Sequence, residues 1–273
     1  SGYPYPSVQV TIGDRQYLFK VASATQGLYV SSRVVKNHEL KVREGNKKLL
    51  NLKGESNKYK LGGEQKYADL GEMRIGDLVL NDVVVSTQKS LMTELDDWQA
   101  PETVDKFYDG LIGLGSLPPE ISWAILPSEG HVSFARGEAV AGLSSGGTTL
   151  PFSQSESTKF QYGTKKGINP GYSMVADVNV GGTMHSTVIS TASVSGFYFA
   201  EDPIPAALNQ RWGDLHVRYH PISLGDAQIG STWMLEGTML PEQPLPARAV
   251  LGMKVLHRFD IVADRVNSTV TFN

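Results

Sequence analysis

Two short stretches of the chain combine small side chains with hydroxyl groups, and the second repeats the first. Ala22-Ser23-Ala24-Thr25 and Ser190-Thr191-Ala192-Ser193 align at a constant offset of 168 residues (191 − 23). A hydroxyl both donates and accepts hydrogen bonds, so these residues are suited to binding and positioning. They are poorly suited to proton transfer near neutral pH, which proteins usually perform with imidazole or carboxyl groups.

A serine nucleophile at Ser190 would need an adjacent base and a strained turn, and the sequence indicates neither. His185 lies five residues upstream (190 − 185), and an odd spacing along a strand places two side chains on opposite faces. No Gly-x-Ser-x-Gly pattern surrounds Ser190. The sequence therefore disfavours a serine hydrolase.

A predicted β hairpin precedes each hydroxyl stretch. Val8–Ile12 alternates apolar and polar residues, Gly13-Asp14 is a turn signal, and Tyr17–Val21 is predicted as the return strand. In the second copy, Val178-Asn179-Val180-Gly181 stands at the corresponding position. An internal repeat of this kind predicts two similar β units facing each other.

Each half of the chain also contains two apolar residues followed by glycine, at Leu111-Ile112-Gly113 and Val250-Leu251-Gly252. With its flanking residues, the run Tyr108–Gly115 resembles the aromatic-Asp-Gly-apolar-apolar-Gly run of the pepsin-like aspartic proteases. The stretch from Val250 through Phe259–Arg265 to Val270 resembles the C-terminal signature of the same family.

This resemblance implies an all-β, two-lobed pepsin-like fold of the double-ψ β-barrel type, with a few short helices. It implies a cleft between two pseudo-symmetric lobes. The N-terminal lobe is expected over residues 1–145, and a shortened C-terminal lobe over residues 150–273. The lobe junction is expected near residues 142–149, where glycine and serine are frequent.

The chain departs from the family where the chemistry should be. The two positions that match the catalytic aspartates hold Ala22 and Ser190, and the two motif glycines are replaced by Ala24 and Ala192. Aspartic proteolysis needs two carboxyl groups that share one proton. Losing one general acid or base typically costs about 10²–10⁴ in rate, and both are absent here. We therefore expect no aspartic protease activity.

The remaining hydroxyl and aromatic residues are candidates for a ligand site. In the family, residues at the positions of Ser23 and Thr191 bridge the lobes, although both could serve only to stabilise a buried turn. A tyrosine followed by glycines forms the tip of a flap in the related proteases, and Tyr59 matches that position. The candidate cleft residues are Ser23, Thr25, Tyr59, Tyr108, Ser190, Thr191 and Ser193.

Secondary structure is also predicted for three further segments. Leu70–Ile75 and Leu78–Val85 are predicted as paired strands, and Pro118–Ile125 as a short helix. The segment from His216 to His220 is predicted as a strand with His216, Arg218 and His220 along one solvent-facing side. Because no third ligand is nearby in the sequence, no metal site is expected, and no cofactor is expected either.

The composition limits the range of partners. A net charge of −3 favours neither nucleic acid nor an anionic membrane surface as a partner. No apolar run approaches the roughly 20 residues that span a bilayer. The chain has no cysteine, and Asn267-Ser268-Thr269 is a glycosylation sequon. The resemblance implies a monomer in the secretory pathway or outside the cell.

Two hypotheses of function follow. In the first, the protein is a pseudoenzyme whose cleft binds a peptide or a small apolar ligand without cutting it. In the second, it is a repurposed enzyme whose neutral cleft directs a cyclisation, elimination or isomerisation of a small molecule in a biosynthetic pathway. The residues do not separate the two hypotheses, and binding is the preferred one.

Overall fold

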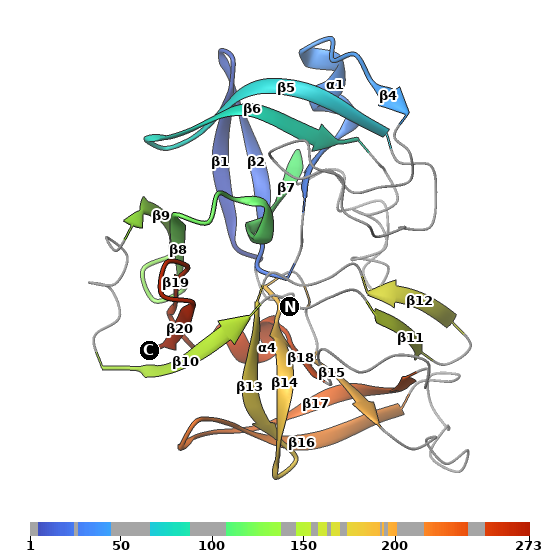
Figure 1. Ribbon diagram of the computed structural model, residues 1–273, viewed down its shortest axis with the longest axis vertical. Coiled ribbons are helices and arrows are strands. Elements are labelled where there is room, and N and C mark those ends of the chain that lie inside the picture. Colours follow the sequence, from blue (N-terminus) through green and yellow to red (C-terminus); the bar gives the residue numbers. More distant parts are fainter. Residues whose placement is uncertain are drawn as a thin grey trace.

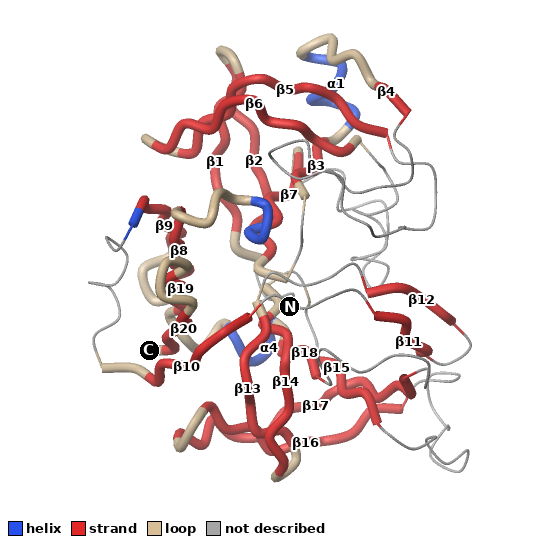
Figure 2. Tube along the Cα trace, in the orientation of Figure 1, coloured by secondary structure: helices blue, strands red, loops and turns tan. Residues whose placement is uncertain are grey.

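The structure is a computed structural model, and its described residues are mainly β strand (Figure 2). It describes residues 5–24, 27–44, 66–87, 108–137, 146–153, 158–162, 165–169, 174–191, 193, 196–200, 216–239 and 249–273. Within these residues, no helix is long and apolar enough to cross a membrane.

The N-terminal half forms a closed six-stranded barrel, seen at the top of Figure 1. Its strands, in the order in which they pair, are β1 (Ser7–Ile12), β2 (Arg15–Ala22), β7 (Gly110–Gly113), β3 (Leu28–Val30), β6 (Leu78–Ser86) and β5 (Lys66–Ile75). The pairing of Thr11 with Arg74 joins β1 to β5 and closes the barrel. The short strand β4 (Arg43–Glu44) pairs with the outer end of β5.

The C-terminal half contains a second closed set of six strands. In the order in which they pair, these are β13 (Val175–Val180), β14 (Thr183–Ile189), β18 (Ala249–Leu251), β15 (Gly196–Ala200), β17 (Ala227–Met239) and β16 (His216–Leu224). The pairing of Val180 with Ile222 joins β13 to β16 and closes the ring. A further hairpin, β11 (Thr158–Tyr162) and β12 (Lys165–Asn169), extends β17.

The two barrels have the same connectivity and the same register. In the first, β2 runs parallel to β7, and Val21 pairs with Ile112. In the second, β14 runs parallel to β18, and Ile189 pairs with Leu251. The offset between Val21 and Ile189 is 168 residues (189 − 21), the value that separates the hydroxyl stretches in the sequence. The prediction of two similar β units is thus confirmed by the strand pairing.

A smaller sheet lies beside the two barrels, on the left in Figure 1. Its strands pair in the order β10 (Thr148–Ser153), β20 (Thr269–Phe272), β19 (Ile261–Asp264), β8 (Ile121–Leu126) and β9 (His131–Arg136). The helix predicted over Pro118–Ile125 is wrong, because this segment provides strand β8. All six residues of β8 are buried, and the strand pairs with β9 on one side and β19 on the other.

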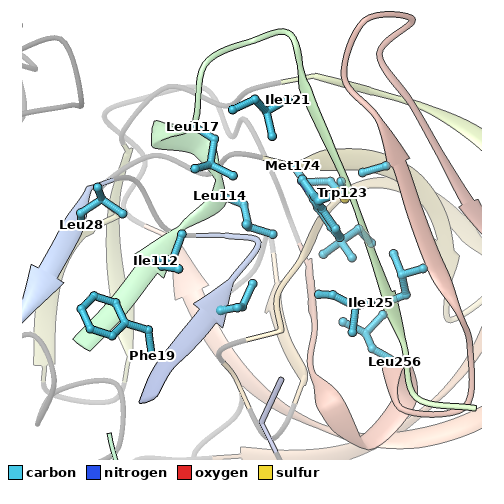
Figure 3. Close-up of a cluster of buried hydrophobic side chains, with 14 of the residues drawn as sticks. Phe19, Leu28, Ile112, Leu114, Leu117, Ile121, Trp123, Ile125, Met174 and Leu256 are labelled. Atoms are coloured by element: carbon cyan, nitrogen blue, oxygen red, sulfur yellow. The ribbon is translucent and has the colours of Figure 1, made fainter. Parts of the chain in front are cut away.

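The hydrophobic core runs through both barrels and the smaller sheet. Figure 3 shows Phe19 and Ile112 on one side of the cluster and Trp123 and Ile125 on the other. Phe19 and Val21 belong to this core, as expected for alternate residues on the inner face of β2. The outer face of β2 therefore carries Lys20 and the terminal Ala22.

Two short α-helices are described. α1 (Ser32–Asn37) follows β3 and buries Val34, whereas α4 (Met253–Leu256) follows β18. The hairpin prediction for residues 70–85 is confirmed by β5 and β6. The prediction for His220 is wrong: it is buried, with 8% of its surface exposed, and the neighbouring Tyr219 faces solvent instead.

Candidate functional site

The candidate site lies where the ends of β2 and β14 meet, near the centre of Figure 1. β2 ends at Ala22 and turns through Ser23, and β14 ends at Ile189 just before Ser190 and Thr191. Each strand is held by its parallel neighbour: Ala22 pairs with Gly113 of β7, and the Ser190 amide donates to the carbonyl of Leu251 (2.9 Å). The barrels thus present their equivalent strand ends to each other.

Ser23 and Thr191 join these ends by four hydrogen bonds. The amide of Ser23 donates to Oγ1 of Thr191, and the amide of Thr191 donates to Oγ of Ser23, both at 3.0 Å. The Ser23 hydroxyl donates onward to the carbonyl of Ile189 (2.5 Å), and the Thr191 hydroxyl donates to the carbonyl of Val21 (2.9 Å). Both side chains are fully buried. Each hydroxyl donates one hydrogen bond and accepts another, so its orientation is fixed.

This junction connects residues far apart in the chain. If each bond contributes about 0.5–1.5 kcal/mol net, four of them stabilise the contact by roughly 2–6 kcal/mol. The two amides would otherwise be buried without a partner, which is costly. The arrangement therefore fixes the two strand ends against each other with little freedom to shift.

The positions beside the junction hold neutral groups. Ala22 is fully buried, and Ser190 is 3% exposed. The Ser190 hydroxyl donates to the hydroxyl of Ser193 (3.0 Å), and the Ser193 carbonyl accepts from the amide of Met253 (2.7 Å). The Ser190 hydroxyl thus donates to another hydroxyl, and among the described residues no base is recorded as its acceptor.

Tyr108 is half-buried and precedes a firmly anchored aspartate. Asp109 is 4% exposed, accepts a hydrogen bond from the amide of Leu18 (3.1 Å) and forms an ion pair with Arg33. Its own amide donates to the Leu18 carbonyl (2.7 Å), and its carbonyl accepts from the amide of Ser31 (2.8 Å). Asp109 therefore ties β7 to β2 and to the start of α1, and this fixes the position of Tyr108.

Four outer-face residues of the first barrel are buried although they lie outside its core cluster. Lys20, Ala22, Tyr29 and Leu111 are each at most 3% exposed. The register explains their common face, because Lys20 pairs with Leu111 of β7 and Leu111 pairs with Tyr29 of β3. Burial raises the pKa of the Tyr29 hydroxyl above its ordinary value of 10.0.

Lys20 is a candidate that the sequence reasoning missed. Its ammonium nitrogen lies 3.3 Å from the centroid of the Tyr5 ring. The signal was present in the sequence: Leu18-Phe19-Lys20-Val21-Ala22 places a lysine two residues before Ala22, and a period of two puts both on one face.

The other predicted residues divide into three groups. Ser23, Thr191, Ser190 and Ser193 are brought together at the strand ends. Tyr108 lies two residues before β7, whereas Ala22 pairs with Gly113 at the other end of that strand, so the structure does not bring Tyr108 to the junction. Thr25, Tyr59 and the motif position Ala192 lie outside the described residues.

Comparison with known proteins adds no assignment. A scan against protein-family models finds no match, and a search of curated proteins finds no significant match. The resemblance to pepsin-like proteases therefore stays a prediction from the sequence motifs.

Proposed function

We propose that the chain is a pepsin-like protein without proteolytic activity, in which a cleft between two lobes binds a peptide or a small apolar ligand. The proposed lobes are residues 1–145 and the shortened 150–273. The shared connectivity of the two barrels supports this assignment, as does the constant offset of 168 residues (189 − 21) between equivalent strand ends.

One observation carries the proposal: the Ser23–Thr191 junction joins two equivalent strand ends, beside Ala22 and Ser190, which the resemblance assigns to the positions of the catalytic acids. A proteolytic dyad needs two carboxyl groups at such a point, one ionised to activate water and one protonated to polarise the scissile carbonyl. Ala22 has no ionisable group, and the Ser190 hydroxyl donates to Ser193. Neither of the two proposed acid positions therefore holds a carboxyl group.

A neutral site of this kind favours an apolar ligand. Ligand sites are mostly apolar surfaces with a few oriented polar groups, and aromatic side chains make suitable walls. The residues at the junction match the first part of that description: Ala22 is apolar, and Ser190 and Ser193 supply hydroxyl groups. The aromatic candidate Tyr108 is half-buried and lies two residues before β7, beyond the end of that strand opposite to the Ala22 pairing with Gly113.

The test combines cleavage and binding in one sample. The protein is incubated with a mixed peptide library and apolar small molecules between pH 2 and pH 8, and mass spectrometry records both products and complexes. We expect intact peptides and at least one saturable complex. Specific cleavage by protein free of contaminating proteases, or the absence of any complex, would contradict the proposal.

A matched pair of variants locates the site. Tyr108→Ala should weaken binding by roughly tenfold if Tyr108 forms a wall of the site, because the loss of a half-buried aromatic contact costs about 1–2 kcal/mol. Tyr219→Ala is the control, since Tyr219 is a 55% exposed tyrosine on β16. Equal effects of the two variants would place the binding surface elsewhere.

The second candidate function is a repurposed enzyme that acts on a small molecule in the same cleft. The observation in its favour is the Ser190–Ser193 hydroxyl pair, which could orient a polar group of a substrate. Ser190→Ala separates the two functions: an apolar binder should keep its affinity, whereas an enzyme that uses the hydroxyl should lose kcat and largely keep KM.

A further inference from the structure

A groove of about 600 Å³ runs along strand β6 of the first barrel, and none of the junction residues lines it. All six residues of β6 from 79 to 84 line the groove, together with Asp69 and Gly71 of β5. Its remaining lining comes from Pro118, which precedes β8, and from Arg136, which ends β9. The volume lies within the range of roughly 300–1,000 Å³ that is typical of ligand sites.

The groove follows an edge of β6 and not one of its faces. Successive side chains of a strand point to opposite faces, so a groove on one face would be lined by alternate residues, whereas six consecutive residues line this one. On the side away from β5, β6 pairs with β3 through Tyr29 and Ser86, beyond residues 79–84. Within the described part of the chain, residues 79–84 make no backbone–backbone hydrogen bond outside the β5–β6 ladder. This edge is therefore open to a further strand.

A bulge places an unpaired carboxylate at the middle of this edge. The register with β5 passes from Val83 to Leu80, so Asn81 and Asp82 have no partner in it, and Asp82 has a positive φ of 53°. A bulge of this kind re-aims a side chain. Asp82 is exposed, and within the described residues no hydrogen bond or ion pair is recorded for it.

The other two charged residues that line the groove are already paired. Asp69 forms an ion pair with Arg43 (2.8 Å), and Arg136 forms one with Glu120 (3.1 Å). Asp82 therefore leaves a net negative charge in the groove. Charge complementarity favours a basic ligand over an acidic one.

We propose that this groove binds an extended peptide segment carrying a lysine or an arginine, which adds as a strand to the open edge of β6. Main-chain hydrogen bonds to the edge give such a complex its affinity, and alternate side chains give its specificity. The basic side chain pairs with Asp82, and apolar side chains of the peptide lie against the half-buried Val79 and Val84. Six residues of edge span about 20 Å at roughly 3.3 Å per residue, enough for a peptide of similar length. The site is independent of the proposed function, because it lies on β6 and not at the ends of β2 and β14.

The test uses three hexapeptides of alternating valine and threonine, acetylated and amidated at their ends, with lysine at the third position. The second peptide has glutamate in place of the lysine, and the third keeps the lysine but is N-methylated at every residue, so that it cannot donate to a strand edge. Proton–nitrogen correlation spectra of ¹⁵N-labelled protein locate each peptide and give its dissociation constant.

Two protein variants test the role of the carboxylate. Asp82→Asn removes it, and asparagine tolerates the positive φ at this position. Asp77→Asn is the control for net charge, because Asp77 is an exposed acid in the turn of the same hairpin and does not line the groove.

We expect the lysine peptide to shift the amide resonances of residues 79–84 saturably, the glutamate peptide to bind more weakly, and the N-methylated peptide to leave these resonances unchanged. Asp82→Asn should weaken binding of the lysine peptide about two- to fivefold, as for an exposed ion pair, whereas Asp77→Asn should change it little.

The absence of a saturable shift at residues 79–84 would overturn the inference, as would equal binding of the N-methylated peptide or equal effects of the two variants. Shifts confined to Ser23 and Thr191 would also overturn it while supporting the proposed cleft. Shifts at residues 79–84 that depend on protein concentration alone would assign the groove to a second copy of the chain and would contradict the inference.

Discussion

The junction between Ser23 and Thr191 should be a large single contributor to stability. Ser23→Ala removes the acceptor of the Thr191 amide and the donor to the Ile189 carbonyl. Thr191→Val, which is nearly isosteric, does the same to the Ser23 amide and the Val21 carbonyl. Each variant leaves a buried amide without a partner at a cost of about 1–3 kcal/mol and loses a further bond of about 1 kcal/mol, giving roughly 2–4 kcal/mol.

The effect of the double variant tests whether the two turns act as a unit. Once one variant has loosened the contact, water can reach the second turn, so the second change should cost less than it does alone. We expect Ser23→Ala with Thr191→Val to be subadditive by about 1 kcal/mol, in the range found for residues in one hydrogen-bond network.

The assay is equilibrium unfolding in urea, followed by fluorescence and circular dichroism. Thr191→Ser keeps the hydroxyl and loses one methyl group, so it should cost only about 1 kcal/mol. Ser186→Ala is the second control, because the half-buried Ser186 of β14 donates a solvent-exposed hydrogen bond to Asp177 (3.0 Å). The reasoning would be refuted if Ser23→Ala and Thr191→Val cost no more than Ser186→Ala.

Three further predictions concern the acid positions, the Asp109 anchor and the buried tyrosine. Ala22→Asp with Ser190→Asp should give little proteolysis, because Ala24 remains in place of the motif glycine; measurable turnover of a denatured protein at pH 3–5 would contradict this. Burial and mutual repulsion raise the pKa of both new carboxyl groups above about 3.9, so the double variant should lose a few kcal/mol of stability as the pH rises through these raised values and should recover it in acid. Asp109→Asn breaks the ion pair with Arg33 but keeps an acceptor for the Leu18 amide, and since the Arg33 side chain is 65% exposed the cost should be about 1–2 kcal/mol by thermal unfolding. Arg33→Gln, which leaves the buried carboxylate unpaired, should cost at least as much, and a neutral effect of both changes would show that Asp109 is not an anchor. Burial raises the pKa of Tyr29, so its contribution to stability is complete below its ordinary pKa of 10.0 and decreases above that pH as the hydroxyl of the unfolded chain ionises; Tyr29→Phe should therefore show a shallower loss of stability between pH 9 and 11.5, and identical slopes would contradict this.

The sequence predicted the repeated parts of the fold well, for a physical reason. The hydroxyl stretches and the apolar-Gly segments occupy equivalent places in the two barrels, so one offset of 168 residues (189 − 21) relates their positions along β2 and β14. The hairpins with glycine turns were also predictable, because Gly13 and Gly76 adopt positive φ angles that glycine tolerates.

Segments whose partners lie elsewhere in the chain were harder to predict. Ile121–Leu126 became a strand because β9 and β19 flank it and all its residues are buried, which a short apolar run does not reveal. His220 is buried on β16, the strand that closes the second barrel. Its ring packs closely against the turn after β13, since a Cβ atom added at Gly181 would lie 3.2 Å from Nδ1 of His220. α1 spans six residues, too few for helical periodicity to be detected.

The candidate site was predictable as far as its motif and no further. The repeat aligned Ser23 with Thr191 in the sequence, and in the structure the two residues hydrogen-bond to each other. Lys20 was missed because a charged residue in a strand is ordinarily assigned to solvent, and only the structure shows that its side chain is buried and lies against the Tyr5 ring.

The central claim is most directly tested at the methyl group of Ala22, the residue that replaces one of the two expected acids. Protein labelled with ¹³C at alanine methyl groups is titrated with the peptide that binds best, and the Ala22 resonance is assigned with Ala22→Gly. The proposal predicts a saturable shift of the Ala22 resonance while the peptide stays intact throughout the titration. Cleavage of the peptide, or saturable binding that leaves the Ala22 resonance unchanged, would contradict it.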